Sequence, residues 1–120
     1  MTGHSGEPMA IFIADVPFDE DNRFKRRPAL VLQIEHERVL VFKITSKFKN
    51  KSKSVQQFYF PITAWQQAGL LRQSYVDIHQ VYSLPAKEVF KKSPIGRLAA
   101  SDILALQGFV QKYRNKTRLV

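Results

Sequence analysis

The chain has 120 residues, 44% of them hydrophobic, which is enough for one globular domain with its own core and too little for two. It contains no cysteine, so disulfides, thiol catalysis and thiolate metal sites are excluded. The net charge is +9, from 19 lysines and arginines against 10 aspartates and glutamates, and it indicates a polyanionic partner only if the cations are clustered.

Four apolar, β-prone runs in the first half of the chain predict strands that are buried on at least one face. They cover residues 9–16, 28–34, 39–45 and 55–60. The charged and aperiodic segments 18–25 and 46–54 are expected to be loops.

A short helix is predicted over residues 61–69, because Pro61 stands near its start and Gly69 at its end. Trp65 within this segment is interpreted as a core anchor. Stacking on a nucleic acid is the alternative for this side chain.

Two further strands are predicted, over residues 74–84 and 95–99. Ser101 and Asp102 then mark the start of a C-terminal helix. Its apolar face carries Ile103, Leu106, Val110 and Tyr113. These elements predict an α+β, mainly β fold, a small and partly open barrel with a short helix and a C-terminal helix.

Residues 1–8 are interpreted as a leader or disordered segment ahead of a single domain over 9–120. No apolar run approaches the roughly 20 residues of a membrane helix, and no secretory signal pattern opens the chain, so a cytoplasmic protein without a membrane partner is expected. The histidines, His4, His36 and His79, are not spaced as metal ligands, so no metal or other cofactor is expected.

Polar groups stand where the second and third predicted strands would meet. Arg27 directly precedes the strand 28–34, while Thr45 and Ser46 end the strand 39–45. An antiparallel hairpin brings the start of one strand beside the end of the next, so these groups are expected at one edge of the sheet.

Basic residues border this edge on both sides. They are Arg23, Lys25 and Arg26 before the first strand of the hairpin, Lys43 near the end of the second, and Lys47, Lys49, Lys51 and Lys53 after it. Such clusters are expected to hold a polyanion, either a nucleic acid or an acidic segment of a protein partner.

Four motifs in order resemble the MazF/PemK-type toxins of bacterial type II toxin-antitoxin systems. They are the segments 26–32 (RRPALVL), 44–46 (ITS), 77–84 (DIHQVYSL) and 95–98 (IGRL). The resemblance implies an SH3-like barrel of the CcdB/PemK type, a homodimer and a metal-independent endoribonuclease that cuts single-stranded RNA at short motifs and leaves a 2′,3′-cyclic phosphate. It also implies neutralisation by an acidic antitoxin segment that lies across the site.

Arg27 and Thr45 match the arginine and threonine of this family's motifs. A guanidinium is a permanent, bidentate donor to a phosphate whose charge grows in the transition state. The Thr45 hydroxyl is expected to hold a phosphate oxygen or to orient the ribose 2′-hydroxyl, with Ser46 as a weaker second donor. Arg26 would point to the opposite side of an extended strand and is expected to steer RNA.

Asp77 and His79 would share one face of the predicted strand 74–84. The chain departs here from the resemblance, because the family has an acidic residue where His79 stands. Two alternatives remain: His79 is the general base with Asp77 as its partner, or His79 is structural and activity depends on Arg27 and Thr45. Gln80, on the other face, is a further candidate RNA contact.

A second class of function is compatible with the same fold but involves no RNA cleavage. A barrel of this kind can also act as a non-catalytic module that binds RNA or docks on a protein, as a CcdB-like poison does. Product formation in addition to binding would distinguish the two classes.

Overall fold

The computed structural model describes residues 7–17, 23–114 and 118–119. Its strands are β1 (Ala10–Pro17), β2 (Phe24–Glu35), β3 (Arg38–Thr45), β4 (Tyr59–Pro61), β5 (Tyr75–Pro85), β6 (Gly96–Arg97) and β7 (Arg118–Leu119). Its helices are α1 (Lys53–Gln56), α2 (Ala86–Val89) and α3 (Ala100–Tyr113). Most of the predicted leader, residues 1–6, and part of the predicted loop, residues 18–22, lie outside the described residues.

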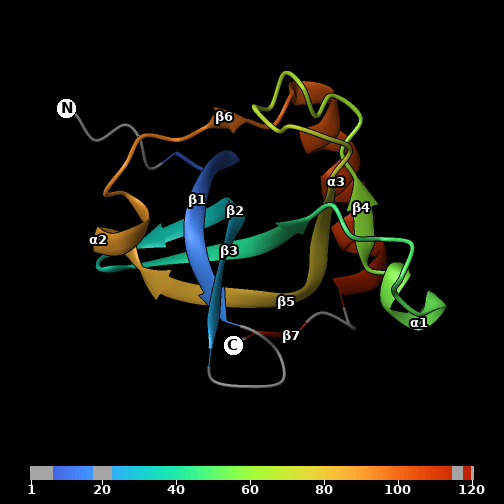
Figure 1. The fold of residues 1–120 in the computed structure, drawn as a ribbon, viewed down its shortest axis with the longest axis horizontal. Coiled ribbons are helices and arrows are strands. Elements are labelled where there is room, and N and C mark those ends of the chain that lie inside the picture. Colours follow the sequence, from blue (N-terminus) through green and yellow to red (C-terminus); the bar gives the residue numbers. More distant parts are fainter. Residues whose placement is uncertain (1–6, 18–22, 115–117, 120) are drawn as a thin grey trace.

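The strands of the described residues form one antiparallel path in the order β4-β5-β3-β2-β1-β6, while β7 runs parallel to β5. In Figure 1, β1 crosses β3 and β5 at a steep angle, which shows how strongly the sheet twists. This sheet curls into a half-barrel with short helices at its margins (Figure 1). The predicted mainly β, partly open barrel is therefore confirmed.

Both faces of the central strands are buried, which explains their nearly continuous apolar sequences. Leu30 and Phe42 pack in one cluster, which α3 covers with partly buried side chains such as Ile103 and Phe109. The neighbouring residues on β2 and β3 pack in a second cluster. That cluster contains Ala29, Val31, Val41 and, from α2, Val89.

The predicted strand over residues 55–60 is wrong in its first half. Residues 53–56 form α1, and β4 begins only at Tyr59. The cause is local, because the Ser52 hydroxyl accepts the backbone N–H of Val55 at 3.4 Å and so caps a helical turn. This bond outweighs the β-propensity of an exposed Val55.

The predicted helix over residues 61–69 is also wrong, because the segment folds as a series of turns. The backbone N–H of Gly69 bonds to the carbonyl of Gln66, while that of Leu70 bonds to Trp65. Trp65 is partly buried against the core, as expected for an anchor.

Asp102 explains why the turn segment keeps this shape. Its buried carboxylate accepts the backbone N–H groups of Thr63 at 3.1 Å and Ala64 at 2.8 Å. The predicted role of Ser101 and Asp102 as a helix start is corrected: α3 begins at Ala100 and its N-cap, Ala99, makes no side-chain cap bond. Asp102 instead fastens α3 to the turns.

Two glycines let the same segment press against β6. A Cβ on Gly69 would lie 2.1 Å from the Ile95 carbonyl oxygen, and one on Gly96 would lie 2.1 Å from the Ala68 carbonyl oxygen. Gly69 also has a φ of +88°, which side-chain-bearing residues rarely adopt. The contact fixes the wall of the cleft described next.

Candidate functional site

A cleft of about 450 Å³ opens where β2 begins and β3 ends, and both Arg27 and Thr45 line it. Ala29 of β2 lies opposite Lys43 of β3. Arg27 precedes Ala29 by two residues and Thr45 follows Lys43 by two, so the hairpin brings the two to one edge of the sheet. The structure thus places in one cleft the arginine and threonine that the sequence paired.

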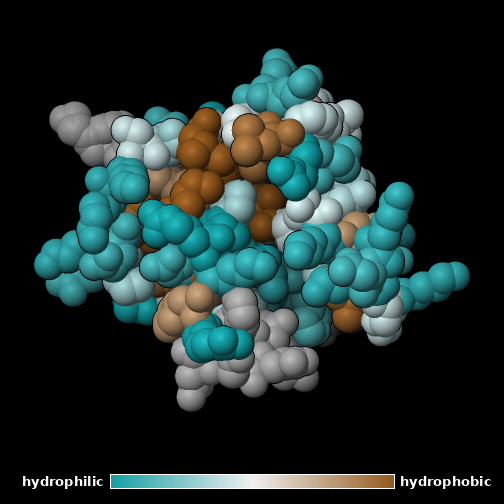
Figure 2. Space-filling model, viewed as in Figure 1, coloured by the Kyte–Doolittle hydropathy of each residue, from teal (hydrophilic) through white to brown (hydrophobic). Residues whose placement is uncertain are grey.

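The other walls of this cleft, hereafter the Arg27 cleft, are mostly apolar. They include Ile13, Ile44, Leu70, Leu71 and Ile95. Leu71 has 88% of its surface exposed. Figure 2 shows apolar atoms gathered between β6 and the segment that precedes β5, with hydrophilic residues around them. An apolar surface of this kind beside a polar site favours contact with another macromolecule.

Cations from two segments of the chain meet at the rim of the Arg27 cleft. The pKa of Lys25 is lowered by repulsion from Arg27 first, and also by Lys47 and Lys51. These four residues, hereafter the cation cluster, join β2 to the segment after β3. Like charges held this close indicate a surface that an anionic ligand would stabilise.

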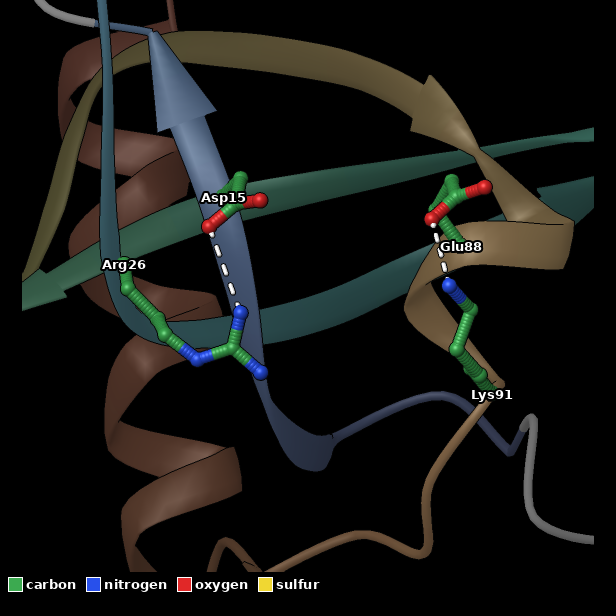
Figure 3. Close-up of polar contacts among 4 residues, drawn as sticks. All are labelled: Asp15, Arg26, Glu88 and Lys91. Carbon is green, nitrogen blue, oxygen red and sulfur yellow. Dashed lines mark hydrogen bonds and ion pairs between the residues drawn. The ribbon is translucent and has the colours of Figure 1, made fainter.

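The sequence placed Lys25 in a loop, but β2 already begins at Phe24. Lys25 and Arg27 therefore project from one face of the strand, and Arg26 from the other. Arg26 donates to the Asp15 carboxylate at 3.4 Å, an exposed ion pair drawn in Figure 3.

Thr45 is buried, and its Oγ1 accepts the backbone N–H of Lys47 at 3.1 Å. The hydroxyl keeps its own proton to donate. Ser46 is exposed next to it, at the same cleft. Thr45 thus shapes the turn into the lysine segment and presents a donor beside Arg27.

The remaining predicted cations are exposed: Arg23 just before β2, Lys49 in the segment after β3, and Lys53 at the start of α1. Gln80 is half-buried and lies opposite Arg118 of β7. None of these residues lines the Arg27 cleft as the described part of the chain forms it.

Asp77 is committed to contacts other than the His79 ring. Its Oδ2 lies 3.6 Å from Lys43 Nζ, and its Oδ1 accepts the backbone N–H of His79 at 3.0 Å. The His79 side chain is exposed, and its ring lies against Phe58 with the centroids 4.7 Å apart. Asp77 therefore positions Lys43 and the backbone of β5.

His79 also stands away from Thr45 along the sheet. Tyr75 lies opposite Thr45, and His79 is four residues further along β5. At 3.2–3.4 Å per residue, the backbone of His79 lies about 13 Å along the strand from that of Tyr75, the residue opposite Thr45.

Sequence reasoning missed Arg72, and it gave Lys43 no role beyond its place in a basic segment. Arg72 lines the Arg27 cleft from the segment before β5. Lys43 shares a face of β3 with Thr45 and pairs with Asp77. The alternation of strand 39–45 was available as a signal for Lys43, whereas Arg72 reaches the cleft only through the turn segment.

No group of three or more histidine, aspartate or glutamate side chains in residues 7–17, 23–114 and 118–119 is arranged to hold a metal ion. Over the same residues, every helix is too short or too polar to cross a membrane.

The fold and the site define a small, curled half-barrel with a cation-rich cleft at one edge of its sheet. A profile of the family described as PemK-like, MazF-like toxin of type II toxin-antitoxin system matches residues 7–113, and the chain belongs to this family. The protein is accordingly a type II toxin, as the motifs indicated.

A solved structure with the same fold is the Mycobacterium tuberculosis toxin MazF-mt6. It is 24% identical in sequence, and the match has a TM-score of 0.63 and covers 88% of this chain and 96% of that chain. A search of curated proteins gave no match.

Proposed function

We propose that this toxin is an endoribonuclease that cuts single-stranded RNA at short sequence motifs, without a metal ion, and so inhibits translation and growth. The observation that carries the proposal is the presence of Arg27 and Thr45 in one cleft, at the rim of which the cation cluster gathers. Membership of the MazF-like family supports the choice of RNA over other polyanions.

RNA brings its own nucleophile to such a cleft. The ribose 2′-oxygen bonds to the adjacent phosphorus and gives its proton to water, and the bond to the 5′-oxygen breaks. That oxygen takes a proton from water, so the products are a 2′,3′-cyclic phosphate and a 5′-hydroxyl. Arg27 stabilises the charge that develops on the phosphate oxygens. The Thr45 hydroxyl donates to a phosphate oxygen or orients the 2′-hydroxyl.

The spacing on β5 favours one of the two roles left open for His79. A general base must come within hydrogen-bond reach of the proton that it removes. His79 stands about 13 Å along the strand from the residue opposite Thr45, which is too far for a phosphate held by Thr45 and Arg27. We therefore assign catalysis to Arg27 and Thr45, with His79 and Gln80 as flanking contacts and Asp77 as the residue that positions Lys43.

The Arg27 cleft and the cation cluster also indicate which macromolecules the protein binds. The exposed apolar side chains of Leu71 and Ile95, at the Arg27 cleft, support a homodimer formed beside the site. The cation cluster supports an acidic antitoxin segment that competes with RNA. The cytoplasm, where messenger RNA is translated, is the proposed location.

The test is incubation of the purified protein with a mixed-sequence RNA in the presence of a chelator, followed by mapping of both ends of each fragment. Cleavage at a short motif with 2′,3′-cyclic phosphate ends is expected. RNA that is bound but left intact across many sequences would instead support the non-catalytic docking module.

A further inference from the structure

A second cleft, of about 400 Å³, adjoins the Arg27 cleft, and Ser46 lines both. Its other lining residues come from the segment after β3, from the segment before β5 and from the first residue of β5: Lys47, Phe48, Lys49, Asn50, Gln73 and Tyr75. We call it the Phe48 cleft. A strand of RNA with a phosphate at Thr45 would pass its neighbouring nucleotide into this space.

Two aromatic rings form a stack at this cleft. The rings of Phe48 and Tyr75 are nearly parallel, with centroids 4.6 Å apart and an interplanar angle of 16°, and Tyr59 packs on both. Phe48 and Tyr75 are only half-buried although they belong to the edge of the core. A half-exposed aromatic pair is a surface on which a nucleobase continues the stack.

The position of Phe48 is fixed by its backbone. Its carbonyl oxygen accepts the backbone N–H of Lys51 at 3.1 Å and the side-chain amide of Gln56 at 2.8 Å. The preceding residue, Lys47, donates its N–H to Thr45 Oγ1. The ring is therefore pre-organised and directly coupled to the threonine of the Arg27 cleft, which lowers the entropy cost of ordering the site on binding.

Gln73 gives the Phe48 cleft a directional polar group. Its Nε2 donates to the carbonyl oxygens of Ile62 and Ser74, both at 3.0 Å, so both amide hydrogens are in use. The atom that it has left for a ligand is Oε1, an acceptor. This acceptor pairs best with an exocyclic amino group, as in adenine, cytosine and guanine. Uracil offers it only the ring N3–H, which lies between two carbonyl oxygens that the Gln73 oxygen repels, so uracil binds less well.

We propose that the Phe48 cleft is a nucleobase subsite that takes the base next to the scissile phosphate and disfavours uracil there. The base stacks on Phe48, which Tyr75 supports from its other face, while Gln73 and Asn50 contact the edge of the base. Lys47 and Lys49 neutralise the flanking phosphates. That this base lies next to the cut rests on the proposed RNA cleavage. Binding of the base itself can be measured without cleavage.

The experiment uses the full chain and two readouts. One is the base preference at each position around the cut in a randomised RNA. The other is the affinity for 2′-O-methyl oligonucleotides, which cannot be cleaved because the nucleophile is blocked, with each of the four bases placed at the tested position.

The variants are Phe48→Leu, which keeps an apolar side chain in the cluster but removes the ring, and Asn50→Ala at an exposed position. Leu104→Ala, on the outer side of α3 with 70% of the residue exposed, is the control. Unfolding curves check that each variant is folded. If Phe48→Leu does not fold, Asn50→Ala still tests the subsite.

Phe48→Leu should weaken binding of the uncleavable oligonucleotides roughly tenfold, the effect of losing one base–aromatic stack, and should flatten the preference at one position only. Asn50→Ala should change the preference at that same position, and Leu104→Ala should change neither readout. Cleavage with unchanged preferences in Phe48→Leu and Asn50→Ala would overturn the subsite and leave the proposed function standing. Binding without cleavage by the wild type would overturn the proposed function, and the Phe48 dependence of that binding would still decide the subsite.

Discussion

Two clefts of similar size flank Ile13 and Arg26, and they differ in the charged groups around them. The cleft beside α2, about 430 Å³, contains two ion pairs: Arg26 with Asp15, and Lys91 with Glu88 at 3.1 Å. Figure 3 shows the first pair beside β1 and the second at α2. The Arg27 cleft has the cation cluster at its rim, where repulsion lowers the pKa of Lys25.

Because the two clefts have similar volumes, cleft size alone does not identify the site. A cleft whose charges are already paired gains little from an ionic ligand, because exposed pairs are worth little and the ligand must compete with them. A surface that holds like charges together gains from any polyanion that relieves the repulsion. If function follows this difference, substitutions at the Arg27 cleft should have the largest effects.

The largest effect should separate Arg27 from its neighbour Arg26. Arg27→Ala should lower the cleavage rate by at least ~10²-fold, the scale for removing one donor that stabilises developing charge. Arg26→Ala removes a cation that is paired with exposed Asp15 and should cost no more than about fivefold. Single-turnover rates on one oligonucleotide measure both, and equal losses would contradict the distinct role given to Arg27.

A smaller effect is expected at Thr45. Thr45→Val keeps the shape of the side chain but removes the donor to the phosphate and the acceptor for the Lys47 N–H, and should slow cleavage about tenfold. Thr45→Ser retains the hydroxyl and should recover most of the rate. A serine variant as slow as the valine variant would show that packing, not the hydroxyl, is what matters.

The smallest effect is expected at His79. Because it stands well along β5 from Thr45, His79→Ala should leave the dependence of rate on pH between about 5.5 and 7 unchanged. The pH profile of the saturating rate is the measurement. If the rise with pH disappears in this variant, His79 is the base after all and the RNA must run along β5.

The strands whose position is set by their own apolar sequence could be predicted. Residues 28–34 and 39–45 are apolar on both faces, and they became the centre of β2 and β3. The segment 61–69 could not be predicted, because Asp102 shapes its backbone from far along the chain. The length of β2 was also missed, since Lys25 pairs with Val16 in a hairpin that local charge argues against.

In the site, too, local sequence patterns predict some features, and contacts between distant segments decide the others. Arg27 and Thr45 could be paired from the sequence, because hairpin register alone brings them to one edge. The partner of Asp77 could not, since a strand pattern shows that it shares a face with His79 but not that Lys43 lies opposite. Arg72 and the Phe48 cleft depend on how the turn segment and the loop fold back, which no local pattern encodes.

The central claim, that the polyanion binds at the Arg27 cleft and not at the cleft beside α2, is tested most directly by salt dependence. One triple variant replaces Lys47, Lys49 and Lys51 by serine, and a matched control replaces Lys87, Lys91 and Lys92 around α2, so that both lose the same charge. All six lysines are exposed, so the fold should persist in both variants.

The quantity measured is the slope of log affinity against log salt for an uncleavable single-stranded RNA. Each phosphate contact contributes about 0.7 to this slope, so the first variant should flatten it by up to about 2. The control variant should keep the slope of the wild type. A control that flattens the slope as much as the first variant would show that RNA follows net charge alone, and would contradict the account.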